Sequence, residues 1–254
     1  MRILVTGGTG VLGRPVVRRL VDAGQEVRVL SRGAPVDDRH ASADLATGRG
    51  VARALAGVDV VVHCATAFGR RAEVALAETL VRAALGAARP HLVYVSIVGV
   101  DRVPLGYYRG KLAAERLIAG SGLPHTILRA TQFHDLVRVL LAKGSRLPVL
   151  PVPALRCQPV DVVDVAGRLA ELAVGSPAGR APDFGGPETL DARELARSFL
   201  RVTGLRKRLV PVRLPGRVFR AYRAGGHLAA DHAGRITFED HLAAHPDPLG
   251  GYRA

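Results

Sequence analysis

The 254-residue chain has no tryptophan, and only 4% of its residues are aromatic. A surface that stacks nucleic-acid bases is built from aromatic side chains, so this chain has little material for one. Its two cysteines, Cys64 and Cys157, are too few for a disulfide framework and lack the spacing of metal ligands. We expect each to be a small residue of the core or of a pocket wall.

Long apolar runs are also absent. The stretches VDVVVHCATAF and LVYVSIVGV are too short to cross a bilayer, and the sequence shows no signal peptide. These absences predict a cytoplasmic protein without a membrane partner. Apolar residues nevertheless make up 48% of the chain, which is enough for a sizeable core.

Lysine is scarce, with three residues among 36 basic ones. The net charge of +14 comes mostly from arginines scattered along the whole chain, and they are densest at 204–226. This scatter predicts nonspecific attraction to polyanions and no specific nucleic-acid partner. The pair His241 and His245 lies in HLAAH, which lacks the glutamate of a zincin motif, so we predict no metal site.

Apolar segments alternate with helical patterns through residue 133, which is typical of a parallel sheet covered on both faces. The expected strands are 2–7, 26–32, a short one ending near 43–45, 59–65, 91–96 and 125–133. The expected helices are 10–24, 50–57, 73–88 and 107–122. The sequence thus predicts an α/β Rossmann fold, a doubly wound parallel sheet whose dinucleotide-binding core covers 1–135.

Beyond Phe133 the pattern changes. Residues 147–159 are too rich in proline for a central strand. Residues 160–175 predict a strand-like opening and a helix, followed by a returning strand near 181–187 and a helix capped by Thr189 or Asp191. We expect residues 136–254 to form a small substrate-binding lobe over the carboxyl edge of the sheet, integrated with the core into one domain.

VTGGTGVLG separates the first strand from the first helix and carries glycines three residues apart, at positions 7, 10 and 13. Gly7 permits the tight bend, Gly10 lets backbone N–H groups approach a pyrophosphate, and Gly13 lets the helix pack closely on the strand. The partial positive charge of the helix N-terminus favours phosphates. The turn therefore predicts a dinucleotide site formed by Gly7, Thr9, Gly10, Val11, Leu12 and Gly13.

The second strand ends at Ser31 and Arg32, without the carboxylate that an NAD site offers to the ribose 2′-hydroxyl. Arg32 can present a planar fork to a 2′-phosphate, and Ser31 a hydroxyl donor. The alternative is a solvated arginine in an arginine-rich chain. The balance favours NADP(H) over NAD(H).

Tyr107 and Lys111 are four residues apart in YYRGK, so a helix would place both on one face and turn Tyr108 away. A free tyrosine has a pKa of about 10, and a nearby ammonium brings proton transfer toward neutral pH because it favours the phenolate. Ser96, at the end of the fifth strand, can hydrogen-bond a substrate carbonyl at the same edge. The alternative is an ordinary amphipathic helix.

The chain carries TGGTGVLG, ADL after the third strand, Ser96, YYRGK and LRATQF. With these motifs it resembles the short-chain dehydrogenase/reductase superfamily, and more closely its extended and atypical, NmrA-like branch of NAD(P)H-binding proteins. The resemblance covers nearly the whole chain. It implies that Tyr107 is the acid/base, that Lys111 activates it and binds the nicotinamide ribose, and that Ser96 polarises a carbonyl. It also implies that the cofactor is lined by Asp44, Leu45, Ala65, Thr66 and Thr131, with 130–133 at the nicotinamide end.

These patterns predict an NADP(H)-dependent oxidoreductase that reduces a carbonyl or an activated double bond of a small, mostly apolar metabolite. An epimerase or dehydratase is a lesser enzymatic variant, and a nonenzymatic NADP(H)-binding redox sensor is the alternative from another class. Only ten residues separate Ser96 from Tyr107, so the substrate loop must be brief. Pocket walls are expected from 67–70, 103–106, 133–137 and the C-terminal lobe. The substrate and the oligomeric state stay open, with a homodimer as one alternative.

Overall fold

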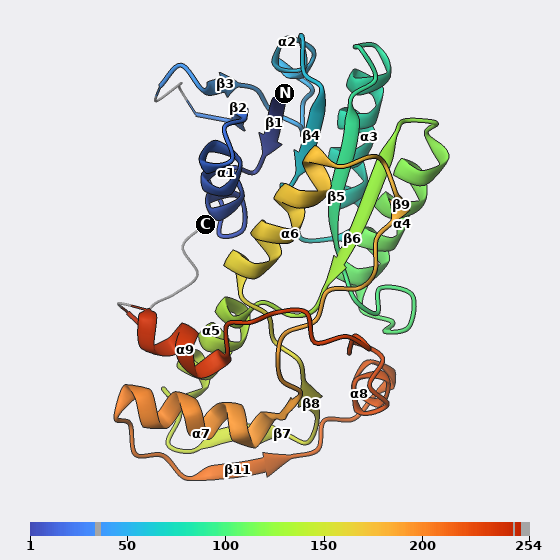
Figure 1. The fold of residues 1–254 in the computed structure, drawn as a ribbon. Helices are drawn as coiled ribbons and strands as arrows, with labels where there is room; N and C mark the ends of the chain where they lie inside the picture. The colour runs from blue at the N-terminus through green and yellow to red at the C-terminus, as the bar shows by residue number, and fades with distance from the viewer. Residues whose placement is uncertain (34–36, 246, 250–254) are drawn as a thin grey trace.

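A seven-stranded parallel sheet forms the centre of the computed structural model, which describes residues 1–33, 37–245 and 247–249 (Figure 1). Its strands are β1 (Arg2–Thr6), β2 (Glu26–Ser31), β3 (His40–Ser42), β4 (Val60–His63), β5 (His91–Ile97), β6 (His125–Ala130) and β9 (Gly179–Arg180). Their order is β3-β2-β1-β4-β5-β6-β9, so the direction of winding reverses between β1 and β4. Doubly wound sheets bind ligands at such a switch point. The predicted fold class is confirmed.

Helices cover both faces of this sheet. On one face, α1 (Gly13–Asp22) lies beside α6 (Val162–Val174), and Ile3 and Val5 of β1 pack into the same apolar cluster. On the other face, Leu4 packs in a cluster with α2 (Val51–Ala54), α3 (Arg70–Leu85) and α4 (Gly106–Gly120). Because both faces are buried, β4 is apolar without alternation, as VVVH shows.

The C-terminal lobe hangs below the carboxyl edge of the sheet (Figure 1). It consists of α5 (His134–Gly144), β7 (Leu150–Pro153), β8 (Arg156–Cys157), β10 (Leu190–Asp191), α7 (Ala192–Thr203), β11 (Leu209–Val212), α8 (Arg217–Arg223) and α9 (Phe238–Ala244). The proline-rich stretch forms β7 and β8, which pair only with β11 and β10 outside the central sheet. Asp191 is the residue that caps α7, through a capping box with Glu194.

Several element boundaries differ from the prediction. The third strand ends at Ser42, because a turn follows in which the Asp44 carboxylate accepts hydrogen bonds from Ala46 N and Thr47 Oγ1. No strand opens at residue 160: Val160 makes a single bridge, and α6 begins at Val162 with Asp161 as its cap. The returning strand β9 comes earlier, at 179–180, although Phe184 still bridges Ala130.

Both cysteines pack against apolar clusters and are unpaired, as predicted. Burial raises the pKa of the Cys64 thiol to about 12, and burial does the same for Cys157. Among the helices of the described ranges, none combines the length and apolarity that crossing a membrane requires.

Candidate functional site

The glycine turn between β1 and α1 lies against the loop that follows β4. Gly7 has a φ of +68°, and a Cβ on it would come within 2.7 Å of Ala65 N. A Cβ on Gly13 would collide with the backbone oxygen of Gly7. The amides of Val11 and Leu12 donate to no other residue in the described chain. The turn is therefore tight, closely packed and supplied with free donors, as a pyrophosphate site requires.

A groove of about 250 Å³ lies beside this turn, between α1, β2 and the start of β3. Its lining includes Thr9, Arg14 and Arg39. Arg14 Nε donates to Thr9 O (2.7 Å), and Arg39 forms an ion pair with Asp37 (2.9 Å). Hydrogen bonds from His40 and Arg39 lower the pKa of Asp37 to about 2. The sequence analysis missed Arg14 and Arg39, because no motif distinguishes them from the many other arginines.

The residues predicted to bind the adenosine end of the cofactor differ in their exposure and in their hydrogen bonds. Arg32 is exposed just beyond β2, and Ser31 Oγ accepts from Gly33 N (3.3 Å). Both carboxylate oxygens of Asp44 bond within their own turn. Leu45 is a core residue, only 4% exposed, and so has little surface left for a cofactor. Contacts of Ser31, Arg32, Asp44 and Leu45 with a cofactor stay predictions.

At the carboxyl edge, the end of β5 meets the beginning of α4. Ser96 is 3% exposed, and its Oγ has no hydrogen-bond partner in the described chain. A buried hydroxyl without a partner costs free energy, so Ser96 Oγ is a group that a ligand can satisfy. Lys111 Nζ donates to the backbone oxygen of Val95, the residue before Ser96 (3.2 Å). The structure thus brings Ser96 and Lys111 to the same edge.

Tyr107 forms its contact with the loop after β4. Tyr107 Oη and Thr66 Oγ1 are 2.7 Å apart, and Thr66 Oγ1 donates to Glu73 Oε2 (2.8 Å). Because a threonine hydroxyl has one proton, Tyr107 is the donor to Thr66. The ring of Phe68, from a predicted pocket wall, lies 5.6 Å from the Tyr107 ring. Ala65 joins this edge to the glycine turn, since its N–H donates to Thr6 Oγ1 (3.3 Å).

Lys111 is held by a residue that the sequence analysis missed. Its Nζ lies 2.8 Å from Glu73 Oε1, with both side chains almost fully buried. Burial alone would lower the pKa of Lys111, but the oxygens of Tyr94, Tyr107 and Glu73 raise it above its usual value. Burial would raise the pKa of Glu73, but Lys111 and hydrogen bonds from Ala67 and Thr66 hold it below its usual value. The two residues form a charged pair inside the protein.

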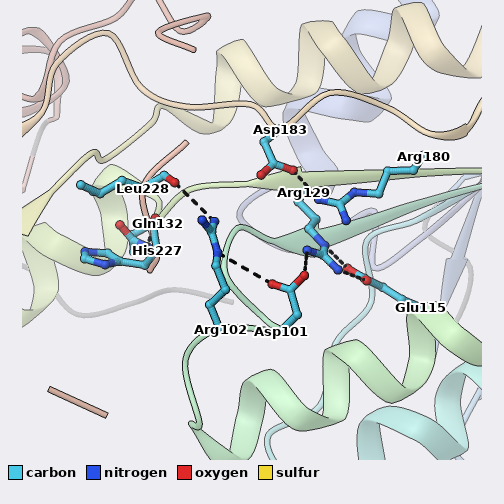
Figure 2. A network of polar contacts seen from close by, with 9 residues as sticks. All are labelled: Asp101, Arg102, Glu115, Arg129, Gln132, Arg180, Asp183, His227 and Leu228. Atoms are coloured by element: carbon cyan, nitrogen blue, oxygen red, sulfur yellow. Dashed lines mark hydrogen bonds and ion pairs between the residues drawn. The ribbon is translucent and has the colours of Figure 1, made fainter. Parts of the chain in front are cut away.

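The C-terminal lobe covers this edge. Val103 and Tyr108 pack in one apolar cluster with Tyr222 of α8, and Tyr222 Oη donates to Tyr108 Oη (3.4 Å). Thr131 is 3% exposed, and its Oγ1 accepts from Gly186 N (3.3 Å). Gln132 Nε2 donates to His227 O (3.4 Å), while its Oε1 is buried without a partner in the described chain (Figure 2). A separate hollow of about 460 Å³ lies within the lobe, between β7, β11 and the start of α7.

An ion network supports the loop that leads into α4 (Figure 2). The guanidinium of Arg129, in β6, bonds both oxygens of Glu115 (2.8 and 2.6 Å) and one oxygen of Asp101 (2.8 Å). Next to Asp101, Arg102 donates to Leu228 O of the lobe (3.5 Å). Sheet, helix and lobe are therefore tied together around residues 98–105. This network fixes the position from which α4 presents Tyr107.

Comparisons with known proteins agree with this geometry. Residues 7–138 match the model of an NAD(P)H-binding family. The chain is 32% identical over 216 residues to a (4-alkanoyl-5-oxo-2,5-dihydrofuran-3-yl)methyl phosphate reductase of Streptomyces griseus, covering 80% of this chain and 74% of that protein. It is 28% identical to the chloroplastic protein High Chlorophyll Fluorescence Phenotype 244 of Arabidopsis thaliana, covering 95% of this chain and 66% of that protein.

Solved structures show the same fold. An NADPH-dependent quinone oxidoreductase of Escherichia coli superposes with a TM-score of 0.78 at 16% identity, covering 95% of this chain and 98% of that one. Because the family match spans more than half of the chain and the Streptomyces protein aligns with most of it, the chain belongs to the NAD(P)H-binding family, in agreement with the resemblance drawn from its motifs.

Proposed function

We propose that the protein is an NADP(H)-dependent oxidoreductase that reduces a carbonyl or an activated double bond of a small, mostly apolar metabolite. One observation carries the proposal. The Tyr107 hydroxyl and the partnerless Ser96 hydroxyl belong to neighbouring elements of one sheet edge, and Ala65 links this edge to the glycine turn. This shared edge supports a site in which a proton donor and an oxygen-binding group lie toward the nicotinamide end of a dinucleotide held by the turn.

The residues present fit the cofactor. The free amides of Val11 and Leu12 would hold the pyrophosphate, and NADP(H), when bound, would supply the hydride. Lys111 Nζ has three N–H donors, of which Glu73 and Val95 O use two. The Tyr94 ring also lies close, with its centroid 4.8 Å from Nζ. A contact of Lys111 with a ribose hydroxyl, the role that the family resemblance implies, stays a prediction.

The proton chemistry follows from the two hydroxyl groups. Ser96 Oγ would hydrogen-bond the oxygen of the substrate carbonyl and hold it in place. Tyr107 Oη would release its proton to that oxygen as negative charge develops on it. Lys111 would then stabilise the phenolate that Tyr107 becomes. Because Ser96 is buried, this exchange would be shielded from bulk water.

The preference for NADP(H) is supported by the arginines near the end of β2. Arg14 and Arg39 line the groove beside the glycine turn, and Arg32 is exposed close by in the chain. Guanidinium groups pair well with the doubly charged 2′-phosphate, and β2 itself ends without a carboxylate; the acid of this corner is Asp37, which pairs with Arg39. The Streptomyces relative is named as a reductase of an alkanoyl-substituted compound, which supports reduction of a carbonyl-containing metabolite.

A coenzyme titration followed by a turnover assay tests the proposal. NADPH should bind more tightly than NADH, measured by the change in nicotinamide fluorescence. A panel of ketones, quinones and enones should include a compound that consumes NADPH with the wild type but not with Tyr107→Phe, which should still bind NADPH. The absence of binding to either coenzyme would overturn the proposal, and so would a variant that turns over at the wild-type rate.

The second candidate is a redox sensor that binds NADP(H) without turnover. The pairing of Lys111 with Glu73 favours it, because the charge that should activate Tyr107 is already neutralised. The sensor predicts that NADPH is bound but not consumed, and that NADPH and NADP⁺ differ in their effect on the affinity for a protein partner. NADPH consumption that disappears in Tyr107→Phe would contradict it.

A further inference from the structure

Glu73 has a place in the site that the proposed reaction does not explain. Its buried carboxylate receives hydrogen bonds from four groups, at distances between 2.8 and 3.0 Å. The donors are Lys111 Nζ, Thr66 Oγ1, Ala67 N and Tyr94 Oη. A carboxylate with so many donors stays ionised, and it connects the predicted activating residue to the hydroxyl that contacts Tyr107.

We propose that Glu73 is a positioning residue that keeps Tyr107 protonated, and so prepares the site for reduction, where the phenol must give up a proton. The proposal rests on the proposed function, because it assigns the state of its proton donor. Glu73 acts through two neighbours, Lys111 and Thr66, and need not touch a substrate.

The first route is electrostatic. A lone buried ammonium on α4 would strongly favour a phenolate at Tyr107, one helical turn away. Glu73 Oε1 lies 2.8 Å from Lys111 Nζ, so the pair has no net charge and its field at Tyr107 is weaker than that of the ammonium alone. The pairing therefore removes much of the electrostatic preference for a phenolate that an unpaired Lys111 would create.

The second route is the direction of the hydrogen bonds. Thr66 gives its one proton to Glu73, and it can only accept from Tyr107. A phenolate at Tyr107 would face an oxygen that has no proton to offer, unless Thr66 rotated away from Glu73. Ala67 N already donates to the same carboxylate oxygen (2.8 Å), which keeps Glu73 in place. This arrangement stabilises the neutral phenol.

Few other charges surround Tyr107. Burial and Lys111 lower the pKa of His63 to about 4, so His63 is neutral near pH 7. Burial raises the pKa values of Tyr94 and Tyr108, which therefore also stay neutral. Arg70, at the start of α3, is exposed, and its backbone faces Gly110 of α4. Of these groups in the described ranges, Lys111 and Glu73 are the two that are both buried and charged.

A spectroscopic titration tests this without a substrate. Tyrosinate absorbance is followed with pH, and the curve of each variant is corrected by the same variant carrying Tyr107→Phe, which isolates Tyr107. Glu73→Gln should lower the midpoint of the Tyr107 titration by about one pH unit or more, because Lys111 is left unneutralised. Lys111→Met should raise it. The double variant, with neither charge, should titrate close to the wild type.

Thr66→Val is the matched control, since it removes the contact to Tyr107 but leaves the Glu73–Lys111 pair intact. Its shift should be smaller than that of Glu73→Gln. Should Glu73→Gln fail to fold, comparing Lys111→Met with the double variant isolates the same effect, and the double variant must titrate at the lower pH. A Glu73→Gln midpoint equal to or above that of the wild type, or a double variant no lower than Lys111→Met, would overturn the proposal.

The two proposals fail in different experiments. Wild-type protein that binds no coenzyme, or consumes none, would overturn the proposed function whatever the titration shows. A titration that does not respond to Glu73 would overturn the positioning role, even in a protein that reduces a carbonyl at the expense of NADPH.

Discussion

Thr66 and Tyr107 are 41 residues apart in the chain, yet their hydroxyl oxygens lie 2.7 Å apart. Thr66 follows β4, and Tyr107 is the second residue of α4, which comes after β5. Since β4 and β5 are parallel neighbours, their carboxyl ends meet at one edge and bring the two hydroxyls together. The order of strands in the sheet therefore determines which side chains share the site.

Removing both groove arginines should change coenzyme choice. The variant Arg14→Ala/Arg39→Ala is expected to weaken NADPH binding by about tenfold or more and NADH binding much less, because hydrogen bonds to a charged phosphate are lost. Dissociation constants from fluorescence titration measure this. Arg193→Ala/Arg197→Ala, which removes two exposed arginines of α7, is the control for net charge. Equal weakening for both coenzymes would place the 2′-phosphate elsewhere.

The glycine turn should not tolerate a methyl group at Gly13. In Gly13→Ala the new Cβ would collide with the backbone oxygen of Gly7, so we expect a loss of about 1–3 kcal/mol in stability, together with loss of NADPH binding. Thermal unfolding and coenzyme titration report the two effects. Gly167→Ala in α6 meets no atom within 4 Å and should stabilise the helix slightly. Wild-type binding by Gly13→Ala would contradict the close-packed turn.

The buried ion network should matter far more than the exposed pair beside it. Arg129→Met would leave the buried Glu115 without its partner and should cost about 3–5 kcal/mol, measured by urea unfolding. Arg180→Met breaks the neighbouring pair with Asp183, which is partly exposed (Figure 2), and should cost less than about 1 kcal/mol. A similar loss of stability in the two variants would show that the burial of the Arg129–Glu115 pair does not increase the cost of breaking it.

Acid should destabilise the protein through His63. Burial lowers the pKa of this histidine from 6.5 to about 4 in the folded state, so between these values the unfolded chain binds a proton that the folded one does not. Stability should therefore fall as the pH decreases from 6.5 to 4, by up to about 3 kcal/mol from this residue. Urea midpoints across this range should depend less on pH in His63→Asn than in the wild type. If the urea midpoint of His63→Asn depends on pH as strongly as that of the wild type, His63 is not the cause of the acid destabilisation.

The sequence predicted those parts of the fold and of the candidate site that depend on local pattern. The strand–turn–helix with Gly7 and Gly13 is one such part, since each glycine is required by its own backbone. The placement of Ser96 and Lys111 at one edge is another, because parallel strands end together. The i, i+4 spacing was enough to put Tyr107 and Lys111 on neighbouring turns of α4.

What the sequence did not reveal depends on contacts between distant elements. Glu73 is a single acid at the start of an apolar helix, and only the packing of α3 on α4 brings it to Lys111. Arg14 and Arg39 meet in one groove because α1 and the start of β3 both lie beside β2, a relationship that no motif records. Leu45 follows the aspartate of ADL, but it is directed into the core, where the end of β3 packs on α2.

The path of the chain after residue 135 has a practical consequence. The chain first leaves the sheet and builds part of the lobe. It then returns as α6, which packs beside α1 on one face of the sheet, and adds β9 next to β6. A fragment that stopped at residue 135 would expose the apolar strip beneath Val165 and Leu169 and an unpaired strand edge, and so would tend to aggregate. Residues 1–135 are therefore not expected to fold as an independent unit. A fusion or chimera that uses them needs the segment 160–181 as well.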